Sequence, residues 1–124
     1  MSEQLTAQSF REMIFDYEKN KEWNYKGRVP AVIDFWAPWC GPCRMVGPVI
    51  DELSAEYEGK VNFYKVNTDE EQDLSGAFGI QSIPSLLFIP MNGEPRMAVG
   101  ALPRKELKKI IENELLVSHA VVAG

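Results

Sequence analysis

Two cysteines, Cys40 and Cys43, are the only ones in the 124 residues, and two residues separate them. They follow a short apolar, β-prone run at residues 31–36 and precede apolar residues that recur at helical spacing. The pair therefore falls where a strand passes into a helix. The first N–H groups of a helix lack intrahelical partners and its dipole is positive there, so a Cys40 thiolate is stabilised and its pKa is lowered. This arrangement predicts thiol–disulfide exchange.

The two cysteines are expected to have different roles. Only Cys40 is expected to be both exposed and at the helix end, which makes it the nucleophile, and Cys43 is then the resolving thiol. Gly41 permits close backbone approach, and Pro42 suits a first helical turn. The structural alternative, a zinc half-site, needs two further ligands. The one histidine, His119, lies near the C-terminus, and we expect no metal.

Length and composition predict one compact domain, with hydrophobic and charged fractions of 45% and 25%. The net charge of −5 argues against nucleic acid or an anionic membrane as partner. No run approaches the ~18 apolar residues of a membrane span. The N-terminus lacks the features of a signal peptide, so we expect a cytoplasmic protein, or a periplasmic one if a signal peptide has been removed.

The order of elements predicts an α/β fold containing a parallel βαβ unit. Helices are expected after Thr6, after the cysteine pair with a kink at Pro48, after Asp69 as N-cap, and from Pro103. Strands are expected at 31–36, 61–66, 85–89 and 96–99. The first helix should bury one face, formed by Phe10, Met13, Ile14 and Tyr17. We expect a single domain over 1–116 and a flexible tail over 117–124.

A charged stretch at residues 18–28 is predicted to be an extended loop or a frayed helix end. Its two aromatic residues, Trp23 and Tyr25, are expected to fold back onto an edge of the core. The alternative for them is a patch that binds a partner.

The segment Trp-Cys-Gly-Pro-Cys, preceded by Val-Ile-Asp-Phe-Trp-Ala, resembles the active-site segment of the thioredoxin family. The resemblance extends through Lys65, Ile83-Pro84 and Val99-Gly100-Ala101-Leu102, and covers roughly residues 31–116. It implies a monomer with the thioredoxin fold, a central mixed β-sheet of about four or five strands flanked by about four helices.

Asp34 is a carboxylate within an apolar run, where desolvation should raise its pKa. The resemblance places it beneath Cys43, where it would exchange a proton with that thiol through water. Lys65, on the neighbouring strand, could pair with Asp34 and oppose the pKa rise. The alternatives are an exposed strand position for Asp34 and a solvent-facing side chain for Lys65.

Ile83 and Pro84 stand just before a predicted strand, where a proline often marks a cis bond. The resemblance implies a cis-proline packed against the cysteine pair, with backbone groups left free for an extended client peptide. Trp39 and Gly100 would complete the docking surface, and Trp36 would support the site from beneath. The chain departs from the family pattern beside the motif at Pro38 and Arg44, which should tune charge and contacts near the cysteines.

The resemblance implies a reductase of protein disulfides that binds no cofactor. Its disulfide would be reset by a thioredoxin reductase linked to NADPH or ferredoxin, and its other partners would be disulfide-containing client proteins. Gly-Pro between the cysteines favours the reducing branch of the family. The alternatives are an extracytoplasmic disulfide oxidase or isomerase of the same fold, and a binding subunit that makes no use of its thiols.

Overall fold

The computed structural model describes residues 2–116. These residues form a mixed five-stranded sheet in the order β1-β3-β2-β4-β5. Strands β1, β3 and β2 are parallel, whereas β4 and β5 are antiparallel to their neighbours. In chain order the elements are β1 (Glu3–Gln4), α1 (Ala7–Met13), β2 (Ala31–Trp36), α2 (Gly41–Glu56), β3 (Asn62–Asn67), α3 (Gln72–Ala77), β4 (Ser85–Ile89), β5 (Arg96–Val99), α4 (Arg104–Ile110) and the π-helical turn η1 (Ile111–Leu115).

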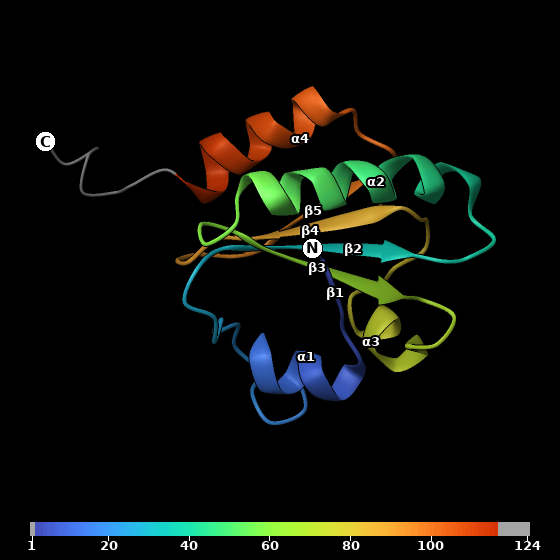
Figure 1. Ribbon diagram of the computed structural model, residues 1–124. Coiled ribbons are helices and arrows are strands. Elements are labelled where there is room, and N and C mark those ends of the chain that lie inside the picture. Colours follow the sequence, from blue (N-terminus) through green and yellow to red (C-terminus); the bar gives the residue numbers. More distant parts are fainter. Residues whose placement is uncertain (1, 117–124) are drawn as a thin grey trace, which may run out of the picture.

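Helices cover both faces of the sheet, with α2 and α4 on one face and α1 and α3 on the other (Figure 1). Each face carries its own buried apolar cluster. Side chains alternate along β2, so Ile33 and Phe35 join the cluster beneath α1, whereas Val32 joins the cluster beneath α2. The same alternation turns Asp34 toward the α2 face. A central strand thus carries a carboxylate to the face that the cysteine helix covers.

Strand β1 is two residues long and pairs in parallel with β3. Helix α1 begins as predicted at Thr6, whose side chain accepts the N–H of Ser9 at 3.0 Å. The predicted apolar face is wrong at its C-terminal end, because α1 stops at Met13 and that residue is 38% exposed. The chain turns after Met13, and the next two residues, Ile14 and Phe15, are both buried.

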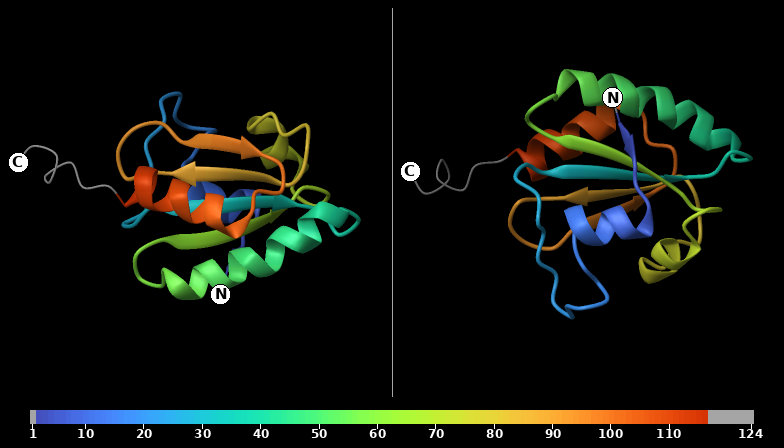
Figure 2. Two further views of the ribbon diagram at one scale, coloured as in Figure 1. Left: turned by 90° about the horizontal axis from the view of Figure 1, so that it is seen from above. Right: turned by 60° about the horizontal axis from the view of Figure 1, so that its bottom comes forward.

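The segment between α1 and β2 contains Trp23 and Tyr25, and both pack against the cluster beneath α1, as predicted. The rings of Phe15 and Trp23 lie 4.9 Å apart, and the Tyr25 hydroxyl donates to the carbonyl of Val29 at 2.7 Å. The segment leaves the domain on the α1 side, away from the N-terminal end of α2 (Figure 2). It therefore contributes nothing to the cysteine site.

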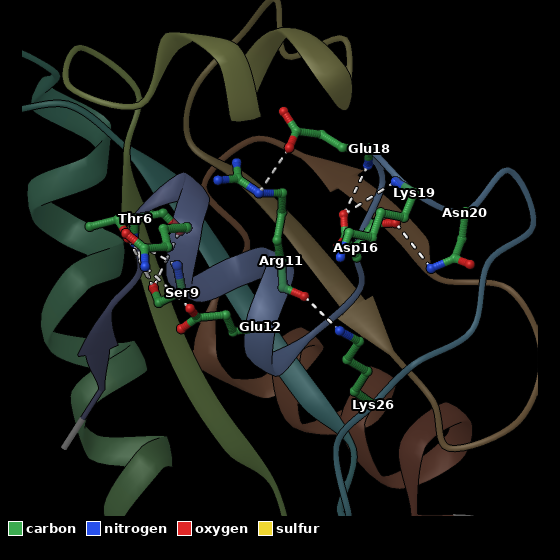
Figure 3. Close-up of polar contacts among 10 residues, drawn as sticks. Thr6, Ser9, Arg11, Glu12, Asp16, Glu18, Lys19, Asn20 and Lys26 are labelled. Carbon is green, nitrogen blue, oxygen red and sulfur yellow. Dashed lines mark hydrogen bonds and ion pairs between the residues drawn. The ribbon is translucent and has the colours of Figure 1, made fainter.

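Polar contacts fasten the same segment to α1 (Figure 3). Arg11 pairs with Glu18 at 3.3 Å, and Lys26 donates to the Arg11 carbonyl at 2.9 Å. Asp16 accepts the backbone N–H groups of Glu18 and Lys19. These contacts close the turn that follows the helix.

The strand boundaries of β2, β4 and β5 match the prediction, and β3 begins and ends one residue later than predicted. Gly93 has a φ of 97° in the turn between β4 and β5, a conformation that glycine adopts without strain. The predicted cap of α3 is wrong, since that helix begins after Glu71 and Asp69 lies outside it. Helix α4 begins at Arg104, one residue after the predicted start, with Pro103 as its N-cap. The tail predicted at 117–124 lies outside the described residues.

Candidate active site

Cys40 is the N-cap residue of α2, and its sulfur is bonded to that of Cys43. The two Cα atoms lie 5.3 Å apart, and the N–H of Cys43 donates to Cys40 Sγ at 3.2 Å. Gly41 and Pro42 form the start of the helix between them, where the missing proline N–H removes no helical hydrogen bond. The structure is thus the disulfide form, with Cys40 Sγ at the positive end of a sixteen-residue helix.

The expectation that Cys40 is exposed is wrong for this form, because Cys40 is 3% exposed and Cys43 is 5% exposed. Both belong to a small apolar cluster with Ala37, against which Trp36 and Ile83 pack. Position rather than whole-residue exposure distinguishes the two sulfurs. Cys40 caps the helix and touches the loop before β4, whereas Cys43 faces inward.

That loop contains the cis peptide bond between Ile83 and Pro84, as expected. The carbonyl oxygen of Ile83 lies 3.8 Å from Cys40 Sγ, while the carbonyl of Pro84 accepts the N–H of Gly100 at 2.8 Å. Within residues 2–116, the N–H of Ile83 donates to no backbone carbonyl. An extended peptide laid beside Cys40 therefore meets free backbone groups at Ile83, and the positive φ of Gly100 (108°) shapes the neighbouring turn.

Asp34 is 1% exposed, and its Oδ1 atom has no hydrogen-bond partner within the described part of the chain. Burial raises the pKa of Asp34 to about 7, with Lys65 lowering it and Asp51 raising it to smaller extents. Asp34 and Cys43 line one cavity of about 270 Å³, together with Gln4, Trp36, Ala37, Pro38, Arg44, Gly47 and Lys65. The cavity has room for water between the carboxyl group and the thiol position.

The expected ion pair between Lys65 and Asp34 is not formed. The ammonium group of Lys65 instead lies 3.4 Å from Oδ1 of Asp51 on α2, although Asp34 and Lys65 are direct partners in the β2–β3 register. The predicted influence of Lys65 on the pKa of Asp34 therefore acts across the cavity rather than through contact.

The aromatic residues beside the cysteines differ in exposure. Trp39 is 69% exposed, and its indole N–H donates to the carboxylate of Asp69. Trp36 is half-buried, packs against the cysteine cluster, and donates to Oε1 of Gln4 at 3.4 Å. The structure thus places Trp39 on the surface and Trp36 beneath the site. Gly41 faces open space, and Pro48 lies exposed within α2.

Sequence patterns did not identify the contacts that two acidic residues make with this site. Asp51 pairs with Lys65, and Asp69 accepts the indole N–H of Trp39. Each of these contacts joins segments that the sequence alone cannot align. Arg44 was predicted to tune contacts near the cysteines, and its guanidinium donates to the carbonyl of Pro38 at 3.1 Å.

No group of three or more histidine, cysteine or acidic side chains suited to a metal occurs among residues 2–116. In the same residues, no helix is long and apolar enough to cross a membrane. The chemistry that these residues can perform is centred on the cysteine pair. A disulfide at a helix N-terminus, a cis-proline loop beside it and a buried carboxyl group behind it define a thiol–disulfide oxidoreductase.

Comparison with known proteins agrees with this class. The thioredoxin family model matches residues 3–113. The chain is 48% identical over 113 residues to thioredoxin of Borreliella burgdorferi, a match that covers 91% of this chain and 97% of the relative. It is 42% identical over 112 residues to thioredoxin 1 of a Nostoc species and 44% identical over 112 residues to thioredoxin of a Synechocystis species. Each of these matches covers 90% of this chain and 95% of the relative.

The chain belongs to the thioredoxin family. It is a protein-disulfide oxidoreductase of the thioredoxin type. Family membership implies a reductase and disulfide-containing proteins as its partners in general.

Proposed function

We propose that this protein reduces client disulfides in two exchange steps, with Cys40 as the nucleophile. In the reduced protein, the Cys40 thiolate attacks one sulfur of the client disulfide. A bond forms between Cys40 Sγ and that sulfur, the client S–S bond breaks, and the other client sulfur leaves as a thiolate that takes a proton. The position of Cys40 at the N-terminal end of α2 supports this role, because the helix dipole stabilises its thiolate.

The second step resolves the mixed disulfide. Asp34, as carboxylate, takes the proton of Cys43 through water in the shared cavity, and the Cys43 thiolate attacks Cys40 Sγ. The Cys40–Cys43 bond forms and the second client thiolate leaves, so the client gains two electrons that the pair loses. The observation that carries this proposal is the unpartnered, buried Oδ1 of Asp34 beside Cys43.

The client peptide docks in extended form between the Ile83–Pro84 loop and Gly100. The free N–H of Ile83 supports this position, because it can pair with a client carbonyl. Trp39 provides an apolar platform on the other side of Cys40. Lys65 acts on the proton step by its charge, from its position as the β3 register partner of Asp34.

The remaining parts of the proposal concern partners and location. The disulfide is reset by a thioredoxin reductase that takes its electrons from NADPH or from ferredoxin, and the protein itself carries no bound cofactor. It works as a monomer in the cytoplasm. The cysteine pair supports the absence of a cofactor, since two thiols supply the two electrons that a disulfide requires.

Single cysteine variants test the roles with insulin as the disulfide-containing probe. Cys43→Ser should accumulate a mixed disulfide with insulin through Cys40, detected as a mass adduct that dithiothreitol removes. Cys40→Ser should form none and should lose turnover. Adduct formation through Cys43 in Cys40→Ser at the same rate would contradict the assignment. A biological function that survives the loss of both thiols, without insulin reduction, would indicate a binding subunit.

A further inference from the structure

Asp34 and Lys65 are placed for direct contact by the sheet. They are Cα partners in the parallel register of β2 and β3, and both line the cavity behind Cys43. Adjacent in-register side chains on one face of a sheet lie close enough for a lysine to reach a carboxyl group. Nevertheless, Oδ1 of Asp34 has no partner among residues 2–116.

The Lys65 side chain is held elsewhere by α2. Its Nζ atom lies 3.4 Å from Oδ1 and 3.5 Å from Oδ2 of Asp51, and the hydroxyl of Ser2 donates to Oδ1 of the same carboxylate at 2.6 Å. Gly47, one turn before Asp51, borders the ammonium group, since a Cβ atom there would lie 3.7 Å from Nζ, an ordinary contact distance. The ammonium group is therefore fixed at the α2 side of the cavity.

We propose that Asp51 is a positioning residue, which keeps the Lys65 ammonium group away from the Asp34 carboxyl group and so preserves Asp34 as a proton acceptor near neutral pH. The inference rests on the proposed role of Asp34. An acceptor that formed a close ion pair would stay ionised and would be a weak base toward a thiol. A lysine held at a distance leaves the carboxyl group able to take a proton and release it.

The groups that face Asp34 determine how its ionisation would respond to the loss of the Asp51 charge. Lys65 faces it from β3, and Arg44, Asp51 and the sulfur of Cys43 face it from α2. Its β4 partner is the apolar Leu86, and Gln4 of β1 is uncharged. Loss of the Asp51 charge therefore removes a repulsion and releases a cation, and both changes favour the ionised form of Asp34.

The test measures the titration of Asp34 by the ¹³C shift of its carboxyl carbon in the oxidised protein, in which Cys43 does not titrate. Asp51→Asn should lower the pKa of Asp34 by about one pH unit, the low end of the effect of a nearby opposite charge. Glu52→Gln is the matched control, because it removes the same charge from an exposed position next in sequence and should leave the titration unchanged. A titration that stays in place or moves upward in Asp51→Asn would overturn the proposal.

The Lys65→Gln variant separates the positioning effect of Asp51 on Lys65 from the direct effect of the Asp51 charge on Asp34. In Lys65→Gln, the further change Asp51→Asn should shift the titration by less than a third of its effect in the natural sequence. A full shift in that background would mean that Asp51 acts through its own charge, which would overturn the positioning role. Side-chain exposure of 47% at Asp51 makes unfolding of the variant a minor concern, and thermal melting checks it.

The role of Asp34 itself is tested separately by the rate at which the mixed disulfide resolves. An unchanged rate in Asp34→Asn would contradict the proposed function and leave the Asp51 titration result standing. If Asp34→Asn slows resolution as expected but Asp51→Asn does not shift the titration of Asp34, only the positioning role would be contradicted. In Asp51→Asn, the midpoint of the pH profile of resolution should fall together with the Asp34 titration.

Discussion

The indole N–H of Trp39 donates to both carboxylate oxygens of Asp69, at 3.0 and 3.2 Å. This contact joins the loop before α2 to the segment before α3, across the surface next to Cys40. A side chain that is 69% exposed would otherwise sample several rotamers. Asp69 therefore fixes the orientation of the platform on which a client is proposed to lie.

Asp69→Ala should lower kcat/KM for insulin reduction by roughly three- to tenfold, the value of one hydrogen bond to a charged group that is partly open to water. The melting temperature should change little, because both residues are at the surface. Glu70→Gln, which removes a neighbouring charge without touching Trp39, serves as the control. Equal losses in the two variants would attribute the effect to charge rather than to the indole contact.

Asp34→Asn should slow resolution of the mixed disulfide by at least about tenfold at neutral pH, since an amide cannot take the proton of Cys43. The first exchange step should proceed at nearly its original rate. Stopped-flow measurement of adduct formation and decay separates the two steps. Unchanged resolution across the pH range would remove Asp34 from the mechanism.

The same variant should be more stable than the natural sequence above pH 7. The folded protein holds the Asp34 proton up to a pKa of about 7, whereas the unfolded chain loses it near pH 4. Stability therefore falls as the pH rises from about 4 to about 7, and Asn removes this loss. We expect a gain of about 2–4 kcal/mol at pH 8 and little difference at pH 4, measured by urea unfolding of the oxidised proteins.

Trp23→Ala should lower the free energy of unfolding by about 2 kcal/mol, because the ring packs on Phe15 and the core cluster but remains partly exposed. Insulin reduction should stay within about twofold, since the segment lies away from the cysteine helix. Tyr25→Phe, which loses only the hydroxyl contact with Val29, is the milder companion. Full stability with lost activity toward one client would instead identify a partner-binding patch.

Two glycine substitutions should act in opposite directions. Gly47→Ala lies inside α2, where its methyl group would make an ordinary contact with Lys65, and it should stabilise the protein by about 0.5–1 kcal/mol. Gly59→Ala has open space, but its φ of 82° strains any residue with a Cβ atom, and it should destabilise by about 1 kcal/mol. Thermal unfolding of both variants checks the signs. Destabilisation by Gly47→Ala would show that the cavity wall cannot accept a methyl group.

Local patterns in the sequence were sufficient for much of the fold. The apolar runs gave the ends of β2 and β4, and Thr6 and Pro103 marked two helix starts. Where the prediction failed, a tertiary contact outweighed the local pattern. Met13 stands at helical spacing but is exposed because the chain turns to bury Phe15, and Asp69 could cap a helix but instead binds Trp39.

In the candidate site, too, local features were predictable and one tertiary contact was not. The cysteine pair, the cis-proline and the buried Asp34 follow from motif and residue type, which the chain carries locally. The pairing of Lys65 with Asp51 rather than Asp34 could not be predicted in this way, because it depends on the distance of α2 from the sheet. A prediction from strand register alone would pair Lys65 with Asp34, whereas in the structure it pairs with Asp51.

The reduction potential of the Cys40–Cys43 pair tests the central claim most directly. The protein would be equilibrated in graded dithiol–disulfide buffers with metal removed, and tryptophan fluorescence would report the redox state, because Trp36 and Trp39 flank the pair. A reductant of client disulfides requires a potential well below that of the glutathione couple, and this is the result we predict. A potential at or above that couple would contradict the account and would indicate a disulfide oxidase or isomerase.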